Sequence, residues 1–202
     1  MSSDLVKAPR GRPKTLSRDH ILDVAMQAYW KEGVDGVSLN EVSMKAEVSK
    51  PGLYREFGNQ DGLMKDVLIS YQEKVITPML QILDTDNSFR ETLDNLVMFV
   101  ITVDEDHELP KGCLIVKMRE SRMRMGEATR EQLDRTLEQI LAVYTDWVER
   151  SKAKGDFSAD MSSHFAATYI YEQLGYAKSQ MERDEKKDDV KKMLTMAFSV
   201  FD

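Results

Sequence analysis

Hydrophobic residues recur every three to four positions along most of this chain, the spacing that places them on one face of an α-helix. Polar and charged residues fill the positions between them. The pattern predicts helices over residues 18–32, 38–46, 50–57, 60–83 and 88–103, one beginning at 111, another over 127–152, and two more that reach the chain end.

Residues that favour helix ends stand at the borders of these stretches. Ser38 with Glu41, and Ser88 with Glu91, have the Ser-x-x-Glu spacing of a capping box, in which each residue's side chain bonds the other's backbone amide. Ser17 and Ser158 are predicted to cap the first helix and the helix that follows Gly155. Gly33 and Gly155 are predicted to end helices, and Pro78 to bend or interrupt the helix over residues 60–83.

The composition agrees with an all-α fold. Leu, Met, Ala, Glu and Lys are common, whereas the 202 residues include only 5 prolines. We expect three parts: a flexible basic arm over residues 1–17, an N-terminal three-helix domain over 18–65, and a larger helical domain over 66–202.

Two short predicted helices, over 38–46 and 50–57, are separated by only a tight turn, which is the layout of a helix-turn-helix. Pro51 fits a first helical turn, where its missing amide loses no hydrogen bond. Gly52 weakens a helix by about 1 kcal/mol, so we expect close approach of its backbone to DNA to offset that loss.

Residues 18–68 resemble the DNA-binding domain of the TetR family of regulators. Residues 28–33, AYWKEG, are similar to the family's first-helix end, and residues 46–58, AEVSKPGLYREFG, to its turn and recognition helix. Two positions depart from the pattern: Glu47 stands in place of a glycine, which strains the turn by about 1 kcal/mol if its φ is positive. Gln60 stands in place of a phosphate-binding lysine, and Lys65 is expected to replace it in part.

The resemblance implies two sets of DNA contacts with a double-stranded operator. One set faces base edges in the major groove, where Arg55 pairs with guanine; it comprises Lys50, Pro51, Gly52 and Arg55. The other holds phosphates and comprises Ser38, Ser49 and Tyr54. The resemblance further implies a homodimer and a repressor that a small-molecule effector releases from a palindromic operator. Residues 18–65 would then be the helix-turn-helix DNA-binding domain, and residues 66–202 the helical regulatory, ligand-binding and dimerisation domain.

Charge is distributed unevenly along the chain, whose net value is −7. Residues 1–18 carry 5 basic against 1 acidic residue, whereas residues 66–202 carry 18 against 26. The basic stretch at 10–14 suits a narrow minor groove, with Arg10, Arg12 and Lys14 as its contacts; a solvated tail is the alternative.

The C-terminal helices offer a ligand site and a dimer interface. From pattern alone, the candidate ligand-binding residues are Met98, Phe99, Cys113, Val116, Tyr144 and Tyr171. The last two helices are apolar enough to pair with their copies in a four-helix bundle, and packing within one chain is the alternative.

Two other functions use the same residues differently. Cys113, the single cysteine, is a candidate trigger for a redox- or electrophile-sensing regulator, although most lone cysteines are inert core residues. A helical interaction protein that binds no DNA is the other alternative. The lone cysteine also favours the reducing cytoplasm.

Several function classes find no support in the sequence. There is no nucleophile–base constellation, so we expect no enzyme, and no cofactor. His107 lies among acidic residues that a solvated loop explains better. The three scattered histidines favour no metal site, and no apolar run is long enough to cross a membrane.

Overall fold

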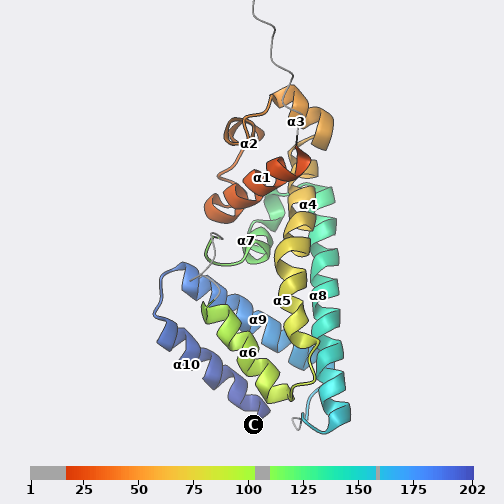
Figure 1. Cartoon of the computed structure of the whole chain (residues 1–202), viewed down its shortest axis with the longest axis vertical. Coiled ribbons are helices and arrows are strands. Elements are labelled where there is room, and N and C mark those ends of the chain that lie inside the picture. Colours follow the sequence, from red (N-terminus) through yellow and green to blue (C-terminus); the bar gives the residue numbers. More distant parts are fainter. Residues whose placement is uncertain (1–16, 103–109, 158–159) are drawn as a thin grey trace, which may run out of the picture.

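The computed structural model describes residues 17–102, 110–157 and 160–202, which form helices and contain no strand. This confirms the all-α fold. Helices α1–α3 lie at one end of an elongated molecule and α6, α9 and α10 at the other, while α4 and α8 run along its length (Figure 1). The predicted arm and its contacts Arg10, Arg12 and Lys14 lie outside the described residues.

The N-terminal end is built from α1 (Arg18–Glu32), α2 (Leu39–Lys45), α3 (Lys50–Phe57) and α4 (Gln60–Tyr71). Ser17 caps α1, Ser38 and Glu41 form the predicted capping box of α2, and Ser49 caps α3. The apolar stripes of these helices meet in one core that includes Ile21, Ala25, Tyr29, Val42, Leu53, Phe57 and Leu63.

The helix predicted over 60–83 is broken into four segments. Helix α4 passes into a π-helical turn, η1 (Gln72–Ile76), then α5 (Thr77–Leu80) and a 3₁₀ turn, η2 (Gln81–Leu83). Pro78 occupies the first turn of α5, directly after the π turn, and it has no amide to donate to the preceding turn. The predicted interruption is therefore present, and it begins upstream of the proline.

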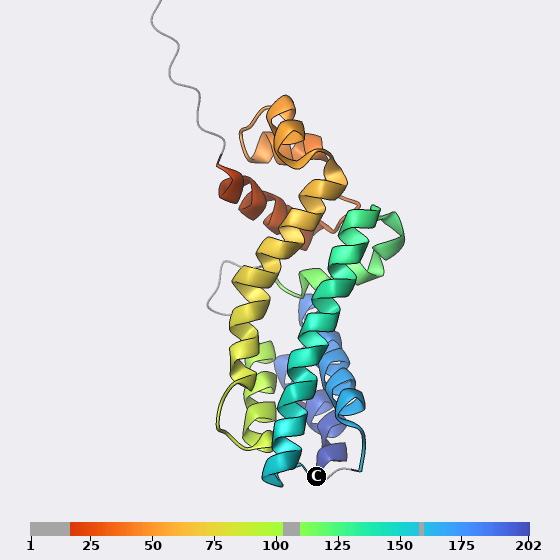
Figure 2. The same ribbon diagram turned by 90° about the vertical axis from the view of Figure 1, so that its right-hand side faces the viewer.

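The remaining helices form the larger end of the molecule. They are α6 (Phe89–Thr102), α7 (Leu114–Glu120), η3 (Arg122–Arg124), α8 (Glu127–Lys154), α9 (Ser163–Glu182), α10 (Lys187–Phe198) and η4 (Ser199–Phe201). Helix α8 packs against α4 on one side and α9 on the other, as the turned view shows (Figure 2). The 28-residue α8 thus joins the two ends of the fold.

Aromatic rings close the end of the molecule that lies away from α1–α3. Phe89 stacks on Trp147 with ring centroids 4.8 Å apart, and Phe157 meets Phe89 edge to face at the same separation. Phe201, the penultimate residue, packs against Phe89 and Phe157. The apolar face predicted for the chain end therefore contributes to this chain's own core through its buried side chains.

Two predicted boundaries need correction. The helix after Gly155 begins at Ser163 and is capped by Ser162, whose hydroxyl accepts a hydrogen bond from the Phe165 amide; Ser158, the predicted cap, lies outside the described residues. The helix predicted to begin at residue 111 begins at Leu114, because Gly112 has a φ of 87°, which no α-helix accommodates. The predicted domain border at residue 65 falls inside α4 and stays a prediction.

Candidate nucleic-acid interface and ligand pocket

Helix α3 has one buried and one exposed face. Leu53 and Phe57 are buried, whereas Lys50, Tyr54 and Arg55 are exposed. No carboxylate within the described ranges pairs with Lys50 or Arg55, and the Tyr54 side chain is 53% exposed. The outward face of α3 therefore presents two unpaired cations around a phenol.

The predicted DNA-contact residues do not all lie on that face. Pro51 and Ser49 are exposed, but Gly52 is buried. It is buried together with Leu53 and Phe57, so it is not part of the exposed face of α3, and the predicted approach of its backbone to base edges is corrected. Its amide donates instead to the Ser49 hydroxyl at 3.3 Å.

The turn between α2 and α3 is held by local bonds. Glu47 has a φ of 55°, the strained conformation that its replacement of a glycine implied. The Ser43 hydroxyl donates to the Val48 carbonyl oxygen at 2.6 Å across the turn. Ser38 accepts from the Glu41 amide at 3.3 Å and lies 3.0 Å from the Glu41 carboxylate. The Ser43 bond therefore closes the turn to α3, and the Ser38–Glu41 bonds cap the start of α2.

Gln60 and Lys65 have structural partners of their own. The Gln60 side-chain amide donates to the Val37 carbonyl oxygen at 3.1 Å, which ties the start of α4 to the segment before α2. Lys65 lies 3.4 Å from the Asp66 carboxylate. Asp66 also binds Arg18, whose guanidinium lies 5.6 Å from the centre of the Phe57 ring. Helices α1, α3 and α4 are therefore one rigid unit behind the exposed face.

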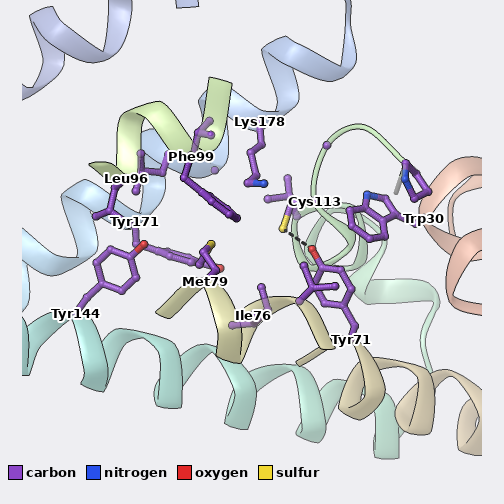
Figure 3. A pocket seen from close by; sticks show the side chains of 17 residues that line it. Trp30, Tyr71, Ile76, Met79, Leu96, Phe99, Cys113, Tyr144, Tyr171 and Lys178 are labelled. Atoms are coloured by element: carbon purple, nitrogen blue, oxygen red, sulfur yellow. Dashed lines mark hydrogen bonds between the residues drawn. The ribbon is translucent and has the colours of Figure 1, made fainter. Parts of the chain in front are cut away.

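The larger end of the molecule encloses a cavity of about 50 Å³. It is lined from α1, α4, η1, α5, α6, α7, α8 and α9, as Figure 3 shows. Five of the six predicted ligand-binding residues line it: Phe99, Cys113, Val116, Tyr144 and Tyr171. The pattern of the sequence thus located a pocket formed by segments far apart in the chain.

Met98, the sixth predicted ligand-binding residue, does not line the pocket. Its side chain is 43% exposed and is not part of the pocket lining. Successive residues of a helix are turned by about 100°, so Met98 faces away when its neighbour Phe99 faces the cavity.

The pocket is apolar with a few polar groups. The Tyr71 hydroxyl lies 3.6 Å from the Cys113 sulfur, and Cys113 is the N-cap of α7. Burial raises the pKa of Tyr71, Tyr144 and Tyr171 well above their usual value of 10, and the nearby Cys113 adds to each shift. All three phenols are therefore neutral at physiological pH.

Several lining residues escaped the sequence analysis. Trp30 on α1 meets Tyr71 on α4 edge to face, with ring centroids 5.0 Å apart, and both line the cavity. Lys178 on α9 is the one charged residue of the lining. Each lies on an amphipathic helix whose core-facing positions all look alike in the sequence, so only packing distinguishes pocket from core.

Comparison with known proteins shows which fold this chain has. Residues 21–67 match the family model described as bacterial regulatory proteins, tetR family. A TetR-family regulator, CifR, in complex with a 26-bp operator DNA has 26% sequence identity and a TM-score of 0.80, covering 95% of this chain and all of that one. Residues 21–67 therefore form a TetR-type DNA-binding domain, and the fold of the chain is that of a TetR-family regulator.

Sequence relatives are transcriptional repressors by name. The repressor ComR of Escherichia coli (strain K12) is 30% identical over 116 residues, which cover 57% of this chain and 55% of ComR. This chain therefore aligns with about half the length of that relative. The repressor DhaR of Mycobacterium sp. (strain GP1) is 21% identical over 92% of each chain.

No helix among the described residues of this chain is long and apolar enough to span a bilayer. The described residues also contain no cluster of three or more His, Cys, Asp or Glu side chains placed to hold a metal ion.

Proposed function

We propose that this TetR-family protein is a DNA-binding transcriptional repressor that a small-molecule ligand releases from a palindromic operator. The observation that carries the proposal is the exposed face of α3, with Lys50 and Arg55 unpaired within the described residues and Tyr54 between them. The relative CifR, whose fold covers this whole α3 region, is bound to operator DNA.

In the proposed complex, α3 lies in the major groove. Arg55 pairs bidentately with a guanine, and Lys50 and Pro51 face neighbouring base edges. Tyr54 and Ser49 contact phosphates, which positions the helix without reading sequence. Ser38 adds a phosphate contact at the start of α2, and Lys65 contributes charge from α4.

A homodimer places two such helices about 34–36 Å apart, one turn of DNA, so that both half-sites of a palindrome are read. Large apolar side chains that stay exposed on α9, α10 and η4 support this assembly: Phe165, Tyr176, Met193, Met196 and Val200. Pairing these helices with their copies would bury them in a four-helix bundle.

The pocket is positioned to alter that spacing. Trp30 belongs to α1 and Tyr71 to α4, so a ligand in the cavity touches two helices that carry the DNA-binding unit. A ligand releases DNA only if it binds more tightly to a conformation whose α3 helices do not fit both half-sites. We infer regulation rather than catalysis, acting on chromosomal DNA in the cytoplasm.

The experiment is a selection of bound duplexes from a random DNA library, followed by titration of the selected site by fluorescence anisotropy. We expect salt-sensitive, site-specific binding. Arg55→Ala should weaken binding by about 1–3 kcal/mol and relax preference at one base pair per half-site. Lys154→Ala, at the far end of α8, is the control and should leave affinity unchanged. Failure to enrich any site contradicts the proposal.

A second candidate function is electrophile sensing by Cys113. Its specific support is that Cys113 lines the pocket, is only half-buried and begins α7. Addition of its S–H across the C=C of an α,β-unsaturated carbonyl forms an S–C bond and transfers the thiol proton to the adjacent carbon, with no oxidant required. Methyl vinyl ketone should then release operator DNA from the wild-type protein but not from the Cys113→Ser variant. Equal release from both would remove this candidate.

A further inference from the structure

We propose that the pocket selects a small organic anion, with its carboxylate held by Lys178, its apolar body among the pocket's aromatic rings, and a second acceptor atom bonded to Trp30. The inference rests on the proposed function, because it names the chemical class of the effector. It follows from two polar groups that the fold leaves without partners.

Lys178 is the only charged side chain among the 17 lining residues. Its ammonium lies 5.3 Å from the centre of the Phe99 ring, so its position is set by an aromatic face rather than by a carboxylate. Figure 3 shows this ammonium beside Phe99, with the side chain reaching in from α9.

The nearest carboxylates of α9 are occupied elsewhere. Glu172 pairs with Arg119 at 2.9 Å. Glu182, one turn after Lys178, pairs with Lys117 at 2.5 Å. Lys117 is itself held at the same distance from the Trp30 carbonyl oxygen. Within the described part of the chain, no acidic side chain neutralises Lys178, so a ligand anion meets an uncompensated charge.

The surroundings strengthen that preference. Leu96, Val100, Leu174 and the aromatic rings replace water around the cavity, and opposite charges attract more strongly in such a low-dielectric site. A neutral ligand of the same shape gains the apolar contacts but leaves the ammonium partly desolvated and unpaired. Of two ligands with the same shape, the pocket should therefore bind the negatively charged one more tightly.

Trp30 supplies the second feature. Its side chain lines the pocket and is 3% exposed, yet its indole Nε1–H has no hydrogen-bond partner. Buried donors are almost always satisfied, so an unpaired one beside a cavity points to an acceptor that arrives with a ligand. Because Trp30 and Lys178 come from α1 and α9, one ligand that engages both joins the DNA-binding unit to the larger end of the molecule.

The cavity's size limits the ligand. About 50 Å³ accommodates only a few atoms as the pocket stands, and Met79 is the lining side chain that moves most readily to enlarge it. A single aromatic ring with a carboxylate at one end and a carbonyl at the other is a small probe that has all three features. 4-Acetylbenzoate has them, 4-acetylbenzamide lacks the charge, and 4-isopropylbenzoate lacks the second acceptor.

Calorimetric titration of the full-length protein without DNA tests the inference. We expect 4-acetylbenzoate to bind about tenfold or more tightly than 4-acetylbenzamide, the range for a hydrogen bond to a charged group. Lys178→Met and Lys178→Gln should abolish that preference, while Lys186→Met, outside the pocket, should keep it. Trp30→Phe should reduce the preference for 4-acetylbenzoate over 4-isopropylbenzoate and leave the charge preference intact.

The inference is overturned if the amide binds as tightly as the carboxylate, if either Lys178 variant retains the preference, or if no carboxylate binds at millimolar concentration. Addition of the best probe to the protein–operator complex separates this inference from the proposed function. Selective binding without DNA release removes the effector role and leaves the ligand class standing. Operator binding by a protein that rejects all carboxylates removes only the ligand class.

Discussion

The Asp61 carboxylate in the first turn of α4 caps α8 through Thr129. The Thr129 amide donates to Asp61 Oδ1 at 3.1 Å, and the Thr129 hydroxyl lies 2.5 Å from the same oxygen and 2.9 Å from the Asp61 carbonyl oxygen. The Ala128 amide donates to Oδ2 at 3.0 Å. Gly126, the N-cap of α8, has no capping side chain, so Asp61 supplies the cap from another helix.

Replacing Asp61 should therefore loosen the junction between the DNA-binding unit and α8. We expect Asp61→Ala to lower the free energy of unfolding by about 1–3 kcal/mol, because Thr129 is fully buried and its amide would lose its partner. Urea denaturation measures the loss. Asp19→Ala, an exposed first-turn aspartate of α1, is the control and should change stability by about 0.5 kcal/mol or less.

Gly126 tests the same junction sterically. A Cβ at Gly126 would lie 2.1–2.6 Å from the Asp61 carboxyl atoms, although its φ of −70° is acceptable for any residue. Gly126→Ala should therefore destabilise the fold by about 1–3 kcal/mol through overpacking. In the Asp61→Ala background the same substitution should be less harmful. Additive losses in the double variant would show that the two residues do not share one contact.

Glu47 stores strain in the turn of the helix-turn-helix. A side chain at a φ of 55° costs about 1–2 kcal/mol relative to glycine. We expect Glu47→Gly to be more stable than Glu47→Ala by about 1 kcal/mol, since both variants lose the same side chain and differ only at the backbone. Thermal unfolding of the pair measures the difference, and equal stability would contradict the strain.

The two capping boxes should make the fold sensitive to acid. The Ser38 amide and hydroxyl lower the pKa of Glu41 below its usual 4.5, and Ser88 does the same for the pKa of Glu91. A carboxyl whose pKa is lower in the folded state stabilises it above the unfolded-state pKa, and that contribution is lost as pH falls through the folded-state pKa. The Glu41→Gln, Glu91→Gln double variant should show a shallower fall in stability from pH 5 to 3.

Tyr54 separates positioning from sequence reading. If its hydroxyl holds a phosphate, Tyr54→Phe should weaken binding to the selected operator and to unrelated DNA alike, by roughly threefold to tenfold. Lys154→Ala at the far end of α8 is the control and should leave both affinities unchanged. A loss confined to the operator would instead mean that Tyr54 reads bases.

Local chemistry made much of this fold predictable. Capping residues such as Ser38 act within four positions of the chain, so the boundaries of α2 and α3 followed from the sequence. The strain at Glu47 was predictable because a glutamate stands at a turn position where the family pattern has glycine. Candidates such as Phe99 and Tyr144 line the pocket because their aromatic positions face the core, and their contact with a ligand stays a prediction.

Long-range pairing was beyond such reasoning. No local pattern indicated the role of Asp61, whose carboxylate accepts hydrogen bonds from amides 67 and 68 positions later in the chain. Lys178 and Trp30 drew no attention because nothing local distinguishes a pocket residue from a neighbouring core residue. Gly52 was misassigned because the side of α3 that meets α2 and α4 depends on their packing.

The π turn of η1 has a geometric consequence for everything that precedes it. A π turn accommodates one residue more than an α turn, so the side-chain directions upstream and downstream of Gln72–Ile76 are offset from those of a continuous α-helix by about 100°. Val75 and Ile76 within this turn line the cavity. If regular α-helical hydrogen bonds replaced the π turn, α4 would rotate about its own axis. Helix α1, which Arg18 joins to α4, and the segment before α2, which Gln60 joins to α4, would rotate with it.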